Sequence, residues 1–258
     1  IYRVIKMINK VFIWGSKSYA LLVNDMLSNP SKSLNLKYLR NKKELGIKFI
    51  FDPYSLKKKY NLSGIYFNEI KEFKKNIKKC KNFVVCIGDN HGKARYFTSK
   101  FLEKFGLKPL TLVSKYSLIS SNTIIGKGVV IMPHSYINTY SKIGDYSILN
   151  SNTNIEHECI IGKGTHIMSG ACIAGRCKIG NYVTIGTNAT ILPDIKIEDG
   201  SFIGAGSVVT KNVKKNSIVV GVPGKYLKSN KHILDEKIFK KILKLSLIHI
   251  SEPTRRYS

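Results

Sequence analysis

The 258-residue sequence lacks the features that would place it in a membrane or outside the cell. It has no run of 18 consecutive apolar residues, which argues against a membrane span. It also lacks the basic start, apolar middle and small-residue cleavage site of a signal peptide. The cysteines are odd in number and show no paired CxxC spacing, so a disulfide framework is not indicated. We therefore expect a cytoplasmic protein. Its five cysteines are Cys80, Cys86, Cys159, Cys172 and Cys177.

Acidic residues are scarce: 16 Asp and Glu stand against 43 Lys and Arg, a net charge of +27. This excess favours anionic partners such as nucleotides, coenzyme A or nucleic acid. The lysines are spread along the chain, and no DNA-reading or RNA-binding motif accompanies them. We therefore interpret most of them as a solvated surface and expect no nucleic-acid partner.

The second half of the sequence repeats with a period of six. Every sixth residue from Ile119 to Val209 is Ile, Leu or Val, and the residues four places later, from Thr123 to Val213, are nearly all small or β-branched. Neither a helix nor a single strand has this period, whereas a coil with three flat sides does. An Ile-Gly pair also recurs every 18 residues, one full coil. Its copies are Ile125-Gly126, Ile143-Gly144, Ile161-Gly162 and Ile179-Gly180.

This pattern predicts a parallel β-helix of about five coils, a prism on the order of 25 Å tall. Cys159 and Cys177 fall on the small inward ladder, so we expect them to fill the core. His157 stands third in its rung, after Ile155, and belongs to neither ladder. Its side chain should therefore project outward from the prism.

The N-terminal third alternates strands at 10–15, 47–52 and 83–90 with helices at 18–27 and 91–105. This order predicts a small Rossmann-like α/β domain with a parallel sheet. Ligands of such sheets bind beyond the carboxyl ends of the strands. A glycine turn before a helix can receive a phosphate, although an ordinary βα turn would look the same. The candidate substrate-binding residues at this edge are Gly15, Ser16, Lys17, Asp52, Gly88, Asp89 and Asn90.

We therefore divide the chain into a Rossmann-like domain at 7–113 and a β-helix domain at 114–228. A C-terminal amphipathic helix follows within 229–245, and its apolar side chains lie on one side between residues 231 and 245. Residues 1–6 and 246–258 read as additions foreign to the native protein, and we leave them out of the fold argument.

Three strings carry a family resemblance: "LNSNTNIEHECIIG" (149–162), "THIMSGACIAG" (165–175) and "VVGVPGKYLK" (219–228). They resemble the hexapeptide-repeat sugar acetyltransferases of the PglD and NeuD group. That group includes N-acetyltransferases of nucleotide-linked 4-amino sugars and O-acetyltransferases associated with sialic acid. The resemblance implies a left-handed β-helix, a homotrimer, acetyl-CoA bound in a cleft between neighbouring prisms, and a sugar nucleotide on the Rossmann-like domain.

Matching the motifs residue by residue implies specific roles. The resemblance makes His157 the general base, Glu158 its orienting carboxylate and Asn150 a residue that positions the acceptor. It places acetyl-CoA against His166, Gly175, Gly221, Pro223 and Lys225, with the Gly175 amide facing the developing oxyanion, and it implies no metal. The expected activity is direct N-acetylation of a UDP- or GDP-linked 4-amino sugar for surface glycan biosynthesis.

Two departures from the family bear on the substrate. The first loop carries Lys17, Ser18 and Tyr19 where the family usually has a second glycine and a histidine, and Ser114 replaces a histidine often found just before the prism. O-acetylation of sialic acid or another sugar is the alternative activity. A metal-dependent hydratase is a further one, but His134, His157 and His166 are not spaced as that family spaces its zinc ligands. A non-catalytic prism is the last.

Overall fold

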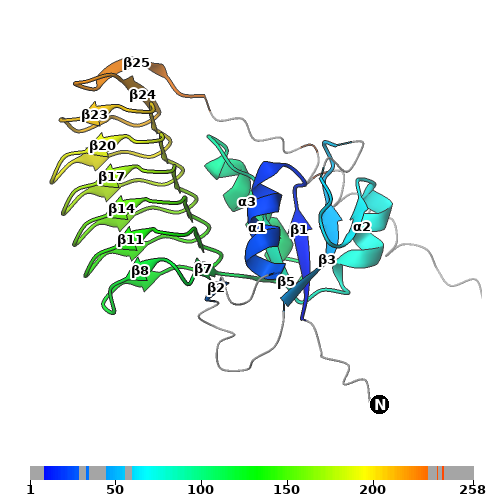
Figure 1. The fold of residues 1–258 in the computed structure, drawn as a ribbon. Helices are drawn as coiled ribbons and strands as arrows, with labels where there is room; N and C mark the ends of the chain where they lie inside the picture. The colour runs from blue at the N-terminus through cyan, green and yellow to red at the C-terminus, as the bar shows by residue number, and fades with distance from the viewer. Residues whose placement is uncertain are drawn as a thin grey trace, which may run out of the picture.

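The computed structural model describes residues 9–28, 33–34, 45–55, 60–231, 237 and 240. It shows a small α/β domain standing beside a long three-sided prism (Figure 1). Among the described residues, no helix is both long enough and apolar enough to cross a membrane. The helix expected at 231–245 lies outside the described residues, apart from 231, 237 and 240.

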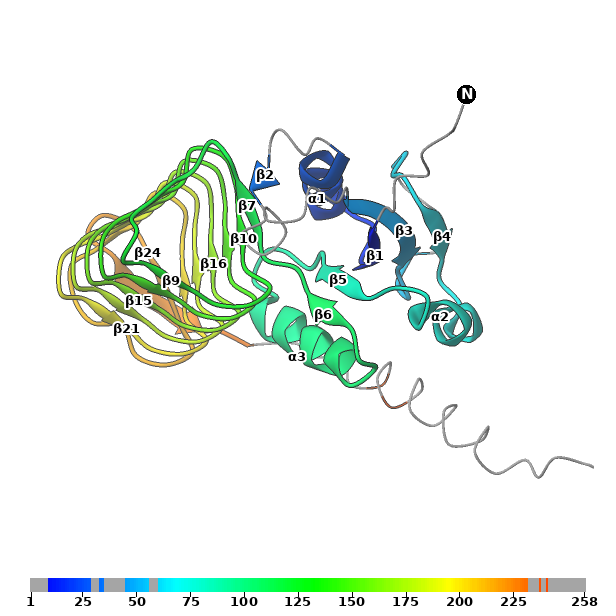
Figure 2. The ribbon, with the colours of Figure 1, turned by 90° about the horizontal axis from the view of Figure 1, so that it is seen from below.

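The N-terminal domain is a parallel five-stranded sheet of order β4-β3-β1-β5-β6. Helix α1 covers one face, and α2 and α3 cover the other (Figure 2). Its elements are β1 (Asn9–Trp14), α1 (Ser18–Ser28), β3 (Leu45–Phe51), β4 (Ile65–Phe67), α2 (Ile70–Ile77), β5 (Asn82–Val85), α3 (Gly92–Glu103) and β6 (Lys108–Pro109). The expected Rossmann-like arrangement is confirmed, while β4, α2 and β6 were not foreseen.

Aromatic side chains fill the space between this sheet and helices α2 and α3. Trp14 packs edge-on against Phe51 with ring centroids 4.8 Å apart, and Phe12 packs edge-on against Phe73 at 5.7 Å. Helix α2 is anchored by the buried Phe73 and Ile77 among lysines. Ile70, Phe73 and Ile77 are spaced as i, i+3 and i+7, the pattern of an amphipathic helix, and burial of Phe73 and Ile77 against the sheet stabilises it.

The prism has three sheets, which we call the domain-facing, second and third sheets. The domain-facing sheet contains β2 (Ser33–Leu34), β7 (Leu112–Ser114), β10 (Val130–Ile131), β13 (Ile148–Leu149), β16 (His166–Ile167), β19 (Thr184–Ile185), β22 (Phe202–Ile203), β24 (Ser217–Val220) and β25 (Lys225–Ser229). The second contains β8 (Leu118–Ile119), β11 (Tyr136–Ile137), β14 (Asn154–Ile155), β17 (Cys172–Ile173), β20 (Thr190–Ile191) and β23 (Val208–Val209). The third contains β9 (Ile124–Ile125), β12 (Lys142–Ile143), β15 (Ile160–Ile161), β18 (Lys178–Ile179) and β21 (Lys196–Ile197).

The prism strands are parallel, except that β2 and β25 pair antiparallel to β7 and β24 at the ends of the domain-facing sheet. The domain-facing sheet packs against the N-terminal domain, because its outward side chains Val130 and Ile148 share one core with Val23 and Met26 of α1. Each coil pairs with the next in a register of 18 residues, as Ile155 with Ile173 shows. Residues 18 apart therefore form columns along the prism.

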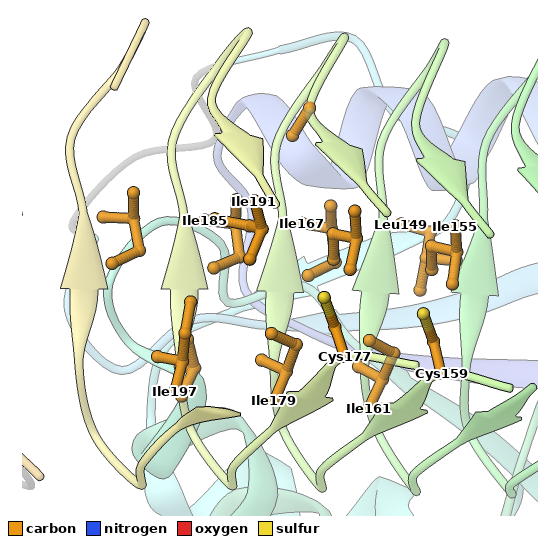
Figure 3. Close-up of a cluster of buried hydrophobic side chains, with 14 of the residues drawn as sticks. Leu149, Ile155, Cys159, Ile161, Ile167, Cys177, Ile179, Ile185, Ile191 and Ile197 are labelled. Atoms are coloured by element: carbon orange, nitrogen blue, oxygen red, sulfur yellow. The ribbon is translucent and has the colours of Figure 1, made fainter. Parts of the chain in front are cut away.

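The inward ladders are confirmed. The large ladder forms stacked columns inside the prism, where Ile155 and Ile167 are fully buried (Figure 3). Small polar residues fill the corners because they bind carbonyls of the next coil: the Ser147 hydroxyl donates to Gly162 O at 2.8 Å. The prediction that Cys159 and Cys177 are core residues is also confirmed, since both are fully buried.

Two adjacent isoleucines of β15 test the ladder. Ile161 is 2% exposed and Ile160 is 44% exposed. Ile161→Ala should lower the free energy of unfolding by about 2–5 kcal/mol, because it leaves a cavity between coils. Ile160→Ala, the matched control, should change it by about 0.5 kcal/mol or less. Urea unfolding followed by circular dichroism measures both, and equal losses would contradict the inward register.

Candidate functional site

His157 and Glu158 lie at the prism corner between the second and third sheets, between the end of β14 and the start of β15. The His157 side chain is 40% exposed and that of Glu158 is 56% exposed, so the expected outward projection is confirmed. Nδ1 of His157 lies 2.9 Å from Oε2 of Glu158. Because an ionised carboxylate only accepts hydrogen bonds, Nδ1 carries the proton and Nε2 keeps its lone pair.

Gly175 lies one coil further along, directly beneath the imidazole. A Cβ added there would stand 2.5 Å from Nε2 and 2.7 Å from Cε1 of His157. Any side chain at position 175 would therefore displace the ring. The structure thus brings together three of the residues singled out by sequence: His157, Glu158 and Gly175.

Two further charged residues extend this corner, and the sequence reading did not identify them. Arg176 and Asp194 follow Glu158 at steps of 18 residues. Nε and Nη2 of Arg176 donate to Oδ1 and Oδ2 of Asp194, each over 2.7 Å. The same 18-residue register that predicted the core would have found both of them.

Asn150 lies at a different corner, between the domain-facing and second sheets. Its backbone N–H donates to Ile167 O over 2.9 Å, and its side-chain Oδ1 is buried without a hydrogen-bond partner. Strand β14 separates Asn150 from His157 within one chain. The structure therefore places these two residues at opposite edges of the second sheet.

His166 opens β16 on the domain-facing sheet and is 3% exposed. Its Nδ1 lies 3.2 Å from the backbone O of Asp89, so it donates to that carbonyl, and Nε2 is buried without a partner. Burial, reinforced by the nearby positive charge of Arg95, lowers the pKa of His166 to about 3. The corner that carries His157 is opposite this sheet, so one chain does not bring the two histidines together.

Arg95 of α3 fixes the 86–90 loop against the prism. Its guanidinium is buried and donates over 2.8 Å to the carbonyls of Ile87, Tyr146 and Gly164. Asn90 adds a second tie, because its Oδ1 accepts from Thr184 Oγ1 over 3.3 Å. The loop that the sequence assigned to substrate binding is thus also the junction of the two domains.

The first loop of the N-terminal domain, between β1 and α1, is held by hydrogen bonds to Asp52. Oδ2 of Asp52 accepts from the backbone N and the Oγ of Ser16, at 2.9 and 2.6 Å, and Oδ1 accepts from Tyr54 N at 3.1 Å. Asp52 and Ser16 are both buried. Direct substrate contact by these two residues is therefore not supported, because their polar atoms already support the loop. Gly15 is required here, since its φ is +101° and a Cβ would lie 2.8 Å from Cys86 O.

The residues that depart from the family pattern have contrasting environments. Lys17 is exposed at the start of α1. Tyr19 is buried, its hydroxyl has no hydrogen-bond partner, and burial raises the pKa of that phenol. Ser114 is buried in β7. At the same edge of the sheet, Asp89 is exposed and Gly88 is half-buried.

The β24–β25 hairpin closes the prism and carries Gly221, Pro223 and Lys225, all exposed. A hollow of about 560 Å³ lies beside it. Its lining includes Tyr226 and three lysines, and it therefore suits an anionic group. The three lysines are Lys211, Lys214 and Lys215. Among the described residues, no three His, Cys, Asp or Glu side chains gather in a way that could hold a metal ion.

The fold and the repeat define the class of the prism. The profile of the bacterial transferase hexapeptide repeat matches residues 122–157, 158–192 and 176–211. The prism is therefore built from hexapeptide repeats of the bacterial transferase type, as the resemblance implied.

Solved structures share the whole two-domain fold. PerB from Caulobacter crescentus, in complex with CoA and GDP-perosamine, is 22% identical, with a TM-score of 0.70, covering 85% of this chain and 97% of its own. The acetyltransferase domain of PglB from Neisseria gonorrhoeae, in complex with acetyl coenzyme A, is 21% identical, with a TM-score of 0.71, covering 85% and 100%. WeeI from Acinetobacter baumannii is 22% identical at a TM-score of 0.52, covering 84% and 99%. By fold and repeat, the chain resembles acetyl-CoA-dependent sugar acetyltransferases.

The buried His166 predicts a pH dependence of stability. Its pKa is about 3 in the folded chain, against an ordinary value of 6.5. The unfolded chain therefore binds one more proton between these values, and stability is lost as the pH falls from about 6.5. His166→Gln should reduce the slope of unfolding free energy against pH by at most about 1.4 kcal/mol per unit between pH 4 and 6.

Denaturant titrations at several pH values measure this slope. Ile161→Ala serves as the control, because it removes stability without removing a titrating group. An unchanged slope in His166→Gln would show that His166 is not buried in its neutral form.

Proposed function

We propose that the protein is an acetyl-CoA-dependent N-acetyltransferase of a UDP- or GDP-linked 4-amino sugar in surface glycan biosynthesis. The observation that carries this proposal is the corner at which His157, with its Nδ1 proton held by Glu158, stands outward over Gly175. The solved relatives support the assignment, since their complexes contain CoA, acetyl coenzyme A and GDP-perosamine.

The geometry of this corner suits direct acetyl transfer. As the amine nitrogen bonds to the thioester carbonyl carbon, His157 Nε2 takes the proton that the amine loses. Glu158 fixes the tautomer and stabilises the imidazolium that forms. The carbon–sulfur bond then breaks, and the imidazolium returns the proton to the departing sulfur, so that coenzyme A leaves as its thiol. Gly175 lies close enough to Nε2 for its backbone N–H to serve the developing oxyanion, which preorganised amides stabilise.

The two substrates would use different parts of the molecule. The lysine-lined hollow beside the β24–β25 hairpin suits the phosphates of acetyl-CoA, near Gly221, Pro223 and Lys225. The exposed Lys17 and the Gly88–Asn90 loop suit the sugar nucleotide at the carboxyl edge of the N-terminal sheet. Asn150, at the edge of the second sheet, is assigned to the acceptor.

This division requires more than one copy of the chain. The N-terminal domain packs on the domain-facing sheet, whereas His157 stands at the opposite corner of the same prism. A sugar held by the domain would therefore reach the base of a neighbouring copy rather than its own. We propose a homotrimer in which Asn150 of one copy faces His157 of the next, while His166 stays covered by the N-terminal domain of its own copy.

Coenzyme A release tests the function with a panel of UDP- and GDP-linked 4-amino sugars and with sialic acid. We expect turnover with an amino-sugar nucleotide, and a loss of at least about 10²-fold in His157→Ala, the lower limit for a general base. Lys196→Gln, on the third sheet, is the control and should keep full activity. Turnover with sialic acid alone would establish O-acetylation instead, and unchanged rates in His157→Ala would overturn the mechanism.

A further inference from the structure

The corner beside His157 carries a column of alternating charge. Glu158, Arg176 and Asp194 occupy the same turn position in three successive coils, each with a φ near +60°. The backbone register fixes this stacking: Arg176 N donates to His157 O over 2.9 Å, and Asp194 N donates to Gly175 O over 3.0 Å. Because successive coils lie roughly 4.8 Å apart, each charged side chain stands directly beside the next.

Arg176 therefore has a carboxylate on either side and binds only one of them. Its guanidinium is engaged with Asp194 through two parallel hydrogen bonds of 2.7 Å each, a geometry that holds a guanidinium firmly. Glu158 is left to bind Nδ1 of His157 at 2.9 Å. If Asp194 lost its charge, Glu158 would be the nearest remaining carboxylate of the column.

We propose that Arg176 and Asp194 are positioning residues for the His157–Glu158 pair: Asp194 holds Arg176 away from Glu158, so that this carboxylate stays with the imidazole. The effect of these residues on catalysis rests on the proposed function, whereas the contacts among Glu158, Arg176 and Asp194 are independent of it. Neither residue is placed in contact with the substrates. Both act through Glu158.

The other charged groups around this corner are accounted for among the described residues. Glu156, directly before His157 in sequence, accepts hydrogen bonds from the side-chain amides of Asn138 and Asn154, at 2.9 and 3.2 Å. On the coil before Glu158, the column holds Tyr140, whose side chain is exposed. The exposed Lys142 and Lys178 flank Ile160 on the adjoining third sheet and stay unchanged in the variants below.

Three variants separate this role from simple stabilisation: Asp194→Asn, Arg176→Gln and the double variant. In Asp194→Asn the freed guanidinium should pair with Glu158 and lower the pKa of His157 by about one unit, the lower end for a nearby charge. Arg176→Gln should not lower it, and the double variant should restore it. NMR titration of the His157 ring, assigned with His157→Gln, measures each value without any substrate.

Glu198→Gln and Lys196→Gln are matched controls. They neutralise the members of another exposed ion pair of the prism, whose charged atoms are 3.2 Å apart. Both should leave the His157 titration unchanged. In the coenzyme A release assay, Asp194→Asn should lose about tenfold or less, below the roughly 10²-fold loss expected without the imidazole, and Arg176→Gln should rescue it.

The outcomes distinguish the two proposals. The positioning role would be overturned if His157 had the same pKa in all three variants, or if the double variant lost as much activity as Asp194→Asn. Either result would count against it even if the enzyme acetylates an amino sugar. The predicted pattern of titrations, with no turnover of any amino sugar, would support the positioning role and reject the proposed function.

Discussion

The backbone register of the prism is the constraint on which the rest of the molecule depends. Each coil buries its inward side chains only against the coils before and after it, so residues 18 apart must stack. The same register that stacks isoleucines inside also stacks the corner residues outside. The register set by the core therefore also arranges the candidate site. It places His157 over Gly175, and it places Glu158, Arg176 and Asp194 next to one another in one column.

Much of this could be predicted from the sequence, because the period of six is local and repeats many times. It gave the three-sided fold, the buried Cys159 and Cys177, and the outward His157. The environment of His166 could not be predicted in this way. Its register places it on a flat face, and only the docking of the N-terminal domain decides that Asp89 O covers its Nδ1.

The N-terminal domain shows the same limit. Its strands were identified from buried apolar runs, whereas α2 was missed although Ile70, Phe73 and Ile77 have helical spacing in that lysine-rich stretch. Asp52 lies where ligands of parallel sheets bind, yet its carboxylate already accepts hydrogen bonds from Ser16 and Tyr54. A position at the edge of a sheet indicates where a ligand binds, and the hydrogen bonds already made decide which residues remain available.

The junction between the domains combines a shared apolar core with the buried guanidinium of Arg95, which bears on how the two halves work together. Burial lowers the pKa of Arg95 to about 10, so it remains charged at neutral pH although it has only carbonyl partners. Separation of the domains would break the hydrogen bonds from Arg95 to Tyr146 O and Gly164 O and would expose the apolar side chains that the two domains share, which is unfavourable in water. The 86–90 loop is therefore held on the prism in one position. A substrate bound to that loop would be presented to a neighbouring corner by a fixed scaffold rather than by a moving lid, which suits the proposed acetyl transfer, whose rate would depend on placing an amine within reach of His157.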